Sequence, residues 1–418
     1  MELDGDFPDF REGELSVFQF EAGLVSCGRG LPGGKVKQSS GDQVFGDDLP
    51  RGLGMEATEE DHVLMTLVIK SKGKLVDLEH IREKISRDVG RKFSEGETAE
   101  ILGSLIERGF VREESRMYAI TEAGREYFED RWRKIREHLN QEYLKVYRAK
   151  RYYPNIAEAL LEICKDRWVS VFRLFTGRAW LQRKLGSRYI TIRSREDVER
   201  WLDIHGIDFI PYVHRINSDR PDWFVLDFDA GREVSMEKVK EVVRATYRFL
   251  EKFGVEPKLK YSGSRGFQLW ARFELHPLPK KYRPMELRTG KRERNHFNFY
   301  ADLVRFVESQ VARDFPGLTT SDTAHKEARR GKILFDASIM KPMGDVRAPY
   351  SMHFKTGQIS MPLNIGELRG FKPEHADPEK VVERYSRRGN EFVLPPVDGS
   401  DFFEEAVDWF DSIRKDVP

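Results

Sequence analysis

A short apolar run that ends in two acidic residues constrains this chain more than any other feature. Trp223-Phe224-Val225-Leu226 is rich in β-favouring residues, so it predicts a buried strand. Asp227 and Asp229 follow, and side chains two positions apart on a strand point to the same face. Two carboxylates this close favour a cation between them, and hard oxygen ligands suit Mg²⁺ or Mn²⁺. The alternative is a strand end in solvent with two hydrated acids.

A loop that could bind an anion comes next. Ser235 is a good helix N-cap, and apolar residues at helical spacing follow it as far as Gly254. Two strands are then predicted at 258–261 and 267–275. The turn between them contains hydroxyl and guanidinium donors between glycines, at Ser262, Ser264 and Arg265. Its backbone N–H groups could converge on a phosphate, although an ordinary hairpin turn is the alternative.

A third carboxylate and a second donor-rich loop lie further along the chain. Asp336 ends the apolar run 333–335, which repeats the pattern of a strand that ends in an acid. Between 346 and 357 the chain carries many groups that can bind phosphate: Arg347, Ser351, His353, Lys355 and Thr356. Three strand-end carboxylates and two such loops are what a two-metal nucleotidyl-transfer site requires.

These motifs, in this order and spacing, resemble those of the archaeo-eukaryotic primase superfamily, which contains the primase small subunit and the polymerase domain of bacterial end-joining ligases. The run 221–229 and its lead-in 212–215 are similar to the first motif of the end-joining polymerases. The second motif resembles 262–268, and the approach to the third carboxylate resembles 329–336. Segment 348–351 is close to the end-joining branch, whereas 351–357 matches the archaeal primase branch.

The resemblance implies a role for each matching residue. Asp227, Asp229 and Asp336 would be catalytic and hold two divalent ions, Mg²⁺ or Mn²⁺. The incoming nucleoside triphosphate would be bound by Ser262, Ser264, Arg265, Gln268, Arg347, Ser351, His353 and Lys355. Gln268 departs from the family pattern, because the family usually has histidine there. Glutamine forms hydrogen bonds but carries no charge, so this position predicts weaker triphosphate binding.

Cysteine usage and hydropathy narrow the cofactors and the compartment. The chain has two cysteines, Cys27 and Cys164, which cannot form the zinc knuckle found in many primase small subunits. We therefore expect no zinc and no disulfide framework, which fits the cytoplasm. No apolar run is long enough for a membrane span, so we expect no membrane partner.

Net charge is +1 across 418 residues, so the distribution of charge matters more than its sum. Two basic stretches with aromatic residues, 134–151 and 280–294, suggest contact with a DNA template or primer. The alternative for each is a solvated surface. Arg178 and Trp180 are expected to help build the catalytic core, and His205 and His214 to be structural.

The part of the chain before the motifs divides in two. Residues 1–55 are rich in Gly, Asp and Ser without periodicity, and predict a disordered or poorly packed extension. Residues 56–133 predict three helices, a hairpin and a final helix, an order that resembles a winged helix-turn-helix. The predicted recognition helix, 94–108, would contact DNA in the major groove. Its four glutamates repel phosphate, so a repair or replication protein is the alternative partner.

The predicted fold is therefore α+β: a primase-polymerase core with an RRM-like mixed sheet over 134–418, preceded by the small winged-helix domain. The predicted function is template-directed addition of nucleotides to a 3′-hydroxyl, in replication priming or DNA repair. The alternative function is a DNA-binding regulatory protein with a degenerate, inactive primase fold.

Overall fold

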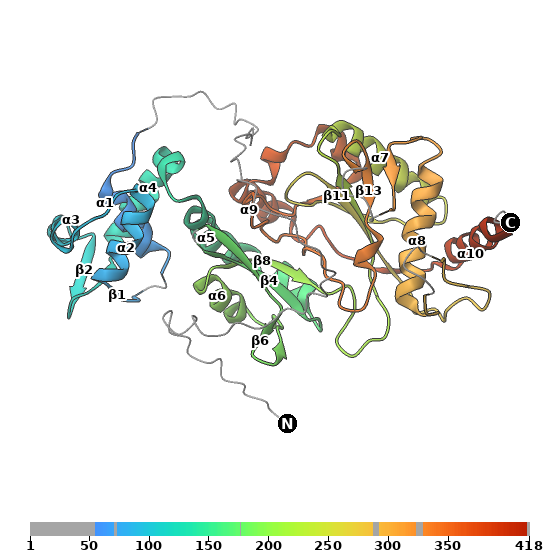
Figure 1. The fold of residues 1–418 in the computed structure, drawn as a ribbon, viewed down its shortest axis with the longest axis horizontal. Coiled ribbons are helices and arrows are strands. Elements are labelled where there is room, and N and C mark those ends of the chain that lie inside the picture. Colours follow the sequence, from blue (N-terminus) through green and yellow to red (C-terminus); the bar gives the residue numbers. More distant parts are fainter. Residues whose placement is uncertain (1–54, 71–72, 176, 287–291, 323–328, 416–418) are drawn as a thin grey trace, which may run out of the picture. The chain divides into compact units, whose positions relative to one another are not determined.

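The computed structural model describes residues 55–70, 73–175, 177–286, 292–322 and 329–415 (Figure 1). The predicted extension over 1–55 lies outside these residues except for Met55. Among the helices described, none combines the length and the apolar character needed to cross a membrane.

An N-terminal unit contains α1 (Glu59–Val68), β1 (Val76–Asp77), α2 (Leu78–Val89), α3 (Glu95–Glu107), β2 (Val111–Glu114), β3 (Met117–Ile120) and α4 (Glu122–Ile135). β3 lies between β1 and β2 in an antiparallel sheet. Ser94 and Thr121 cap α3 and α4 with their hydroxyls, because each accepts a hydrogen bond from a backbone N–H three residues on. The helices and the hairpin occur in the predicted order, and the classification as a winged helix remains a prediction.

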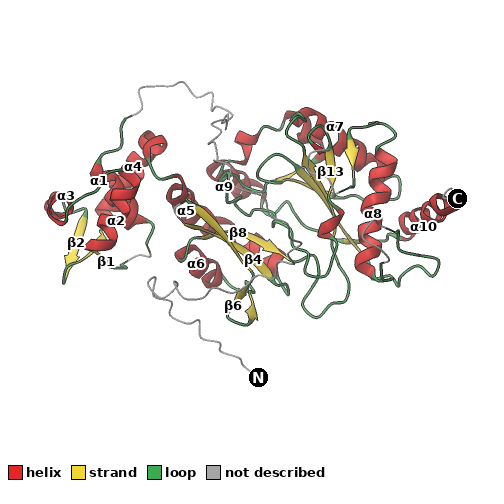
Figure 2. Cartoon of the chain, in the orientation of Figure 1, coloured by secondary structure: helices red, strands yellow, loops and turns green. Residues whose placement is uncertain are grey.

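The remaining residues form an α+β fold, as the sequence predicts (Figure 2). Its helices are α5 (Gln141–Cys164), α6 (Arg195–Asp203), α7 (Met236–Glu251), α8 (His296–Val311), α9 (Pro378–Arg388) and α10 (Ser400–Lys415). Its strands are β4 (Val169–Phe175), β5 (Arg178–Gln182), β6 (Lys184–Leu185), β7 (Arg188–Tyr189), β8 (Gly206–Pro211), β9 (Phe224–Ala230), β10 (Lys258–Tyr261), β11 (Phe267–Phe273), β12 (Thr319–Thr320), β13 (Ile333–Phe335), β14 (Pro362–Leu363) and β15 (Pro396–Val397).

The main sheet is mixed and has the strand order β12-β13-β9-β11-β10-β14, with β15 parallel to β11. β12 and β13 are also parallel, and the other neighbouring strands run antiparallel. β9, the strand that carries both aspartates, is therefore paired on both sides. Ser235 caps α7 as predicted, and the bounds of β10 agree with the prediction.

The two faces of the main sheet differ in what covers them. Phe224 contacts Tyr300 of α8 and Phe402 of α10, and α7 packs against β9 and β11. Helices therefore cover the face to which Phe224, Leu226 and Phe228 point, and Figure 1 shows α7 and α8 beside β11 and β13. Asp227 and Asp229 alternate with these residues and point to the other face. The helix-covered core thus directs both carboxylates to one side.

A smaller sheet of order β5-β4-β8 lies beside α5 and α6. Tyr143, Leu144 and Tyr147 of α5 belong to the apolar core of the N-terminal unit, whereas Tyr152 and Tyr153 belong to the main core. α5 is thus shared between the two cores. A boundary near residue 133 would separate α5 from the N-terminal core, to which the first part of α5 contributes. The position of the domain boundary remains a prediction.

Candidate active site

The three predicted carboxylates come together at neighbouring strands of the main sheet. Asp227 and Asp229 lie on β9, and Asp336 follows β13, which pairs with β9. The backbone N–H of Asp336 donates a hydrogen bond to the carbonyl of Asp227 at 3.1 Å. The Asp336 carboxylate accepts the N–H of Ser338 at 2.9 Å and so caps the short helix η3 (Ala337–Ile339). Asp229 is exposed, whereas Asp227 and Asp336 are partly buried.

Crowding of these carboxylates changes the acidity of Asp227. Burial raises the pKa of Asp227 to about 7, and the negative charges of Asp336 and Asp229 act in the same direction. A hydrogen bond from Gln268 and the positive charge of Lys260 oppose the shift. The ionised form of Asp227 therefore lacks enough positive charge around it, and a bound cation would supply that charge.

The donor set fits a hard divalent ion that also binds substrate. Within the described part of the chain, no three Asp, Glu, His or Cys side chains are arranged as a ready metal cage. Mg²⁺ seldom needs such a cage, because it is commonly held by one or two carboxylates together with water and substrate phosphates. Asp227, Asp229 and Asp336 offer carboxylate oxygens of this kind on the face of the sheet opposite the helices, where Asp229 is exposed.

The loop between β10 and β11 lies against the end of β9. A Cβ atom on Gly266 would lie 2.3 Å from the carbonyl oxygen of Phe228, so only glycine allows this close approach. Ser262 closes the turn: its N–H donates to the Gly266 carbonyl at 3.0 Å, and its hydroxyl accepts the Gly266 N–H at 3.2 Å. Ser264 is partly buried and Arg265 is exposed, so the Arg265 guanidinium is accessible to a ligand.

A second loop, residues 351–357, is joined to the first. The Thr356 hydroxyl donates to the Gly263 carbonyl at 2.5 Å. Gly263 has φ +85°, and a Cβ there would lie 2.9 Å from that of His353. Together these two contacts place His353 and Lys355 beside Ser262–Gly266. The predicted donors of both loops, although about 90 residues apart in the chain, therefore form one group.

His353 is held as a neutral hydrogen-bond donor. Its Nδ1 accepts the backbone N–H of Lys355 at 3.1 Å, so the proton of the neutral ring is on Nε2. Burial lowers the pKa of His353 to about 3, and the charge of Arg347 acts in the same direction. Lys355 is exposed and is the cation that this loop offers to a ligand.

Two residues predicted to bind the nucleotide are engaged inside the protein instead. Arg347 forms a bidentate pair with Asp208 of β8, with both N···O distances 2.8 Å. Ser351 is fully buried; its hydroxyl accepts the Phe209 N–H and donates to Asp208. Arg347 also donates to the Ser262 carbonyl at 3.2 Å. Through these contacts both residues support the two loops, and their contact with the nucleotide remains a prediction.

Gln268 is likewise engaged away from the loops. It is 4% exposed, and its amide nitrogen donates to Asp227 Oδ1 at 3.0 Å. Its amide oxygen accepts the indole N–H of Trp270 at 3.0 Å. The structure thus places Gln268 beside Asp227, and its contact with the triphosphate remains a prediction.

Two buried charged residues near the site were not anticipated. Asp208 is fully buried and also accepts the N–H of Phe354 at 3.2 Å. Lys260 of β10 is fully buried, lies opposite Gln268 in the sheet, and donates to the Ser360 hydroxyl at 2.7 Å. Burial keeps the pKa of Lys260 well below its usual range. The pairing of β10 with β11 places Lys260 on the same face as Gln268. This pairing joins separate strands, so it could not be predicted from the residues around Lys260.

In the α5 part of the stretch 134–151, cations that were predicted to contact DNA have acidic partners within the protein. Arg148 pairs with Asp377 and Glu379 at 2.5 and 2.6 Å, and Lys150 pairs with Asp203 at 2.8 Å. Tyr152 and Tyr153 are buried in the main core. This helix face is therefore used for packing within the protein.

The second basic stretch is divided between internal and exposed residues. Arg292 pairs with the buried Asp302, and Arg294 donates to backbone carbonyls. Lys280 and Lys281 are exposed. Arg283 and Arg294 are exposed as well, so these four cations are the ones in the described part of the stretch that are accessible to DNA.

Trp180 was expected in the core, and the structure corrects this. The side chain is 55% exposed and lies on β5, an edge strand. Arg178 on the same strand is also exposed. The surrounding segment, 173–195, contains seven cations and no carboxylate: Arg173, Arg178, Arg183, Lys184, Arg188, Arg193 and Arg195.

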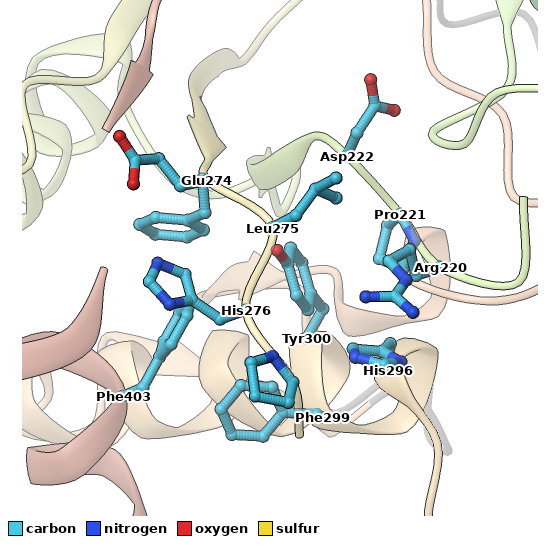
Figure 3. A pocket seen from close by; sticks show the side chains of 12 residues that line it. Arg220, Pro221, Asp222, Glu274, Leu275, His276, His296, Phe299, Tyr300 and Phe403 are labelled. Carbon is cyan, nitrogen blue, oxygen red and sulfur yellow. The ribbon is translucent and has the colours of Figure 1, made fainter. Parts of the chain in front are cut away.

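A small cavity lies near the other end of β11, away from the carboxylates (Figure 3). His276, His296 and Tyr300 line it, and its volume is about 10 Å³. That is room for about one water molecule. The cavity is too small for a nucleotide.

Comparisons with known proteins agree on one family. The LigD primase-polymerase domain matches residues 181–392, just over half of the chain. An uncharacterized protein of Methanocaldococcus jannaschii, MJECS07, is 23% identical over 245 residues, which are 56% of this chain and 48% of that protein. The multifunctional non-homologous end joining protein LigD of Pseudomonas aeruginosa is 25% identical over 181 residues, or 43% of this chain and 19% of that protein. The chain thus spans about half of the first relative and about a fifth of the second.

A solved structure shows the same fold. The polymerase domain of Mycobacterium tuberculosis ligase D, in complex with DNA, superposes with a TM-score of 0.50 at 21% sequence identity. The similarity covers 59% of this chain and 90% of that domain.

Proposed function

The chain belongs to the LigD primase-polymerase domain family, and we propose that it is a nucleotidyltransferase that extends a DNA 3′-hydroxyl with nucleotides from nucleoside triphosphates. The observation that carries the proposal is the placement of three carboxylates beside two joined, donor-rich loops. The Thr356–Gly263 hydrogen bond and the Gly266–Phe228 approach bring these parts together. The family suggests end-joining repair as the process in which the chain acts. The functions in the relatives' names are those of the relatives.

The carboxylates would hold divalent ions. Asp227, Asp229 and Asp336 supply oxygen ligands of the type that Mg²⁺ and Mn²⁺ prefer. Bound ions at such a site would favour ionisation of the attacking hydroxyl and offset the charge on the leaving pyrophosphate. The main sheet would hold Asp227 and Asp229 rigidly, because β9 is paired on both sides and packs against helices.

The two loops would hold the triphosphate. Arg265 and Lys355 are exposed cations, and His353 presents a neutral Nε2–H donor. The hydroxyls of Ser262 and Ser264 and the backbone N–H groups of the turn would add neutral donors. Arg347 and Ser351 would act through Asp208, by fixing the positions of both loops.

We propose that β5 and its flanking hairpin contact single-stranded DNA. An exposed tryptophan on an edge strand offers a flat surface on which a base can stack, and cations around it can follow a phosphate backbone. Arg183 and Arg195 pair with Asp345 and Glu158, but no ion pair among the described residues uses Arg178, Lys184 or Arg188. Those three cations are thus available to phosphate.

The N-terminal unit is better suited to a protein than to DNA. On α3, the predicted recognition helix, Glu95, Glu97, Glu100 and Glu107 are all exposed. Four carboxylates on that helix oppose approach to a phosphate backbone. We therefore propose a protein partner from repair or replication for this unit.

Primer extension tests the proposed activity. A labelled primer on a template with a 5′ overhang, with nucleotides and Mg²⁺ or Mn²⁺, should be extended in a template-dependent way. The Asp336→Asn variant should lose extension, whereas Glu251→Gln, which alters an exposed carboxylate on α7, should keep it. Binding of the DNA without extension under any metal would favour the inactive, DNA-binding alternative.

A further inference from the structure

Three side chains form a row across neighbouring strands, on the face of the main sheet that carries Asp227 and Asp229. In the sheet register, Lys260 of β10 lies opposite Gln268 of β11, which lies opposite Asp227 of β9. Side chains directly opposite one another in an antiparallel pair lie on the same face and within contact distance. Gln268 is therefore the immediate neighbour of Asp227, and it separates Asp227 from the buried Lys260.

The orientation of the Gln268 amide is fixed by Trp270. An indole N–H can only donate a hydrogen bond, and it lies 3.0 Å from the Gln268 amide oxygen. The amide nitrogen must then face Asp227, whose Oδ1 lies 3.0 Å away. Because a carboxylate can only accept, both contacts agree with this single orientation. A donor aimed at Asp227 is thus built into the sheet.

We propose that Gln268 is a positioning residue for Asp227, which keeps one carboxylate oxygen bonded so that the other faces the divalent ion. This inference rests on the proposed function, since it assigns Asp227 to metal binding. It is an alternative to the prediction that Gln268 binds the triphosphate. Hydrogen-bond partners of metal ligands typically contribute about 10–100-fold to metal affinity or activity.

Gln268→Met is the most direct test, because methionine is unbranched and similar in length but has no donor for Asp227. Mn²⁺ binding to the purified protein is measured by electron paramagnetic resonance of the free ion, without DNA or nucleotide. We expect the dissociation constant for Mn²⁺ to rise about tenfold. In primer extension, the KM for the nucleotide at saturating Mn²⁺ should stay near that of the wild type.

Trp270→Phe provides a second variant, because it removes the N–H that orients the amide and leaves Gln268 in place. It should weaken Mn²⁺ binding in the same direction, and it keeps the test available if Gln268→Met does not fold. Gln310→Glu, a substitution on α8, is the control and should bind Mn²⁺ as the wild type does. Unchanged Mn²⁺ binding in both test variants would overturn the inference, as would wild-type protein that binds no Mn²⁺.

The outcomes separate this inference from the proposed function. Weaker Mn²⁺ binding in the variants of a protein that extends no primer would support the positioning role and refute the activity. Extension by the wild type, with Gln268→Met altering only the nucleotide KM, would support the activity and show that Gln268 contacts the nucleotide.

Discussion

Replacing Asp227 with asparagine should stabilise the protein in the absence of metal. The folded chain keeps the Asp227 proton up to a pH of about 7, whereas the unfolded chain loses it near 3.8. Between these values unfolding releases a proton, so the free energy of unfolding falls as the pH rises. At pH 8 the wild type carries the full cost of the ionised group, which Asp227→Asn does not.

The size of this effect follows from the pKa shift. A change from 3.8 to about 7 corresponds to a ceiling of about 4 kcal/mol at about 1.4 kcal/mol per pH unit. Because Asp227 is only partly buried, solvent screening reduces this, and we expect about 1–2 kcal/mol. That corresponds to a rise in Tm of about 1–3 °C for a folded unit of this size.

Thermal unfolding in a chelator provides the assay. The Tm of Asp227→Asn should exceed that of the wild type at pH 8, and the difference should shrink as the pH is lowered to about 5. Adding Mn²⁺ should raise the Tm of the wild type more than that of the variant, because a ligand of the folded state stabilises it. A variant that is less stable than the wild type at pH 8, or a difference that does not depend on pH, would refute this account of the carboxylate cluster.

Three further predictions concern the surfaces and supports of the site. Trp180→Ala should weaken binding of single-stranded DNA about tenfold in fluorescence anisotropy, whereas Leu275→Ala, at a side chain that is 79% exposed, should not; equal effects would argue against stacking on β5. Asp208→Asn should lower the free energy of unfolding by about 3 kcal/mol and raise the nucleotide KM, because it leaves Arg347 without its charged partner. If both quantities kept their wild-type values, Asp208 would not be needed to hold the loops in place. The His353 ring should show no titration between pH 5 and 8 by NMR, since its pKa lies at about 3, and a midpoint near the ordinary 6.5 would contradict its burial.

Local signals in the sequence predicted much of the fold. The alternation from Phe224 to Asp229 placed both carboxylates on one face, and Ser235 marked the start of α7. β10 was predicted with the bounds that the structure shows. These features depend on neighbouring residues, which explains why periodicity and capping were sufficient.

The contacts that define the site depend on residues far apart in the chain. Asp208 and Arg347 are separated by 139 positions, and nothing in either local sequence shows that they pair. Gln268 meets Asp227 only because β9 and β11 pair in one particular register. The resemblance assigned Gln268 by its position in a motif, which carries no information on hydrogen-bond partners within the protein.

Exposure was also hard to read from composition. The basic, aromatic stretch of α5 resembled a nucleic-acid surface, yet Arg148 and Lys150 have acidic partners that are more than 50 positions away in the chain. Trp180 resembled a core residue, yet it lies on an edge strand. In both cases the exposure of the side chain depended on which helices and strands pack against it.

A crystal structure with Mn²⁺ and a non-hydrolysable nucleoside triphosphate analogue would test the central claim most directly. We expect anomalous density from Mn²⁺ at coordination distance from Asp227 and Asp336, with the triphosphate bound by Arg265, His353 and Lys355. Gln268 should still donate to Asp227. Triphosphate bound elsewhere on the protein, or Mn²⁺ absent from these carboxylates, would contradict the assignment of this face of the sheet as the active site.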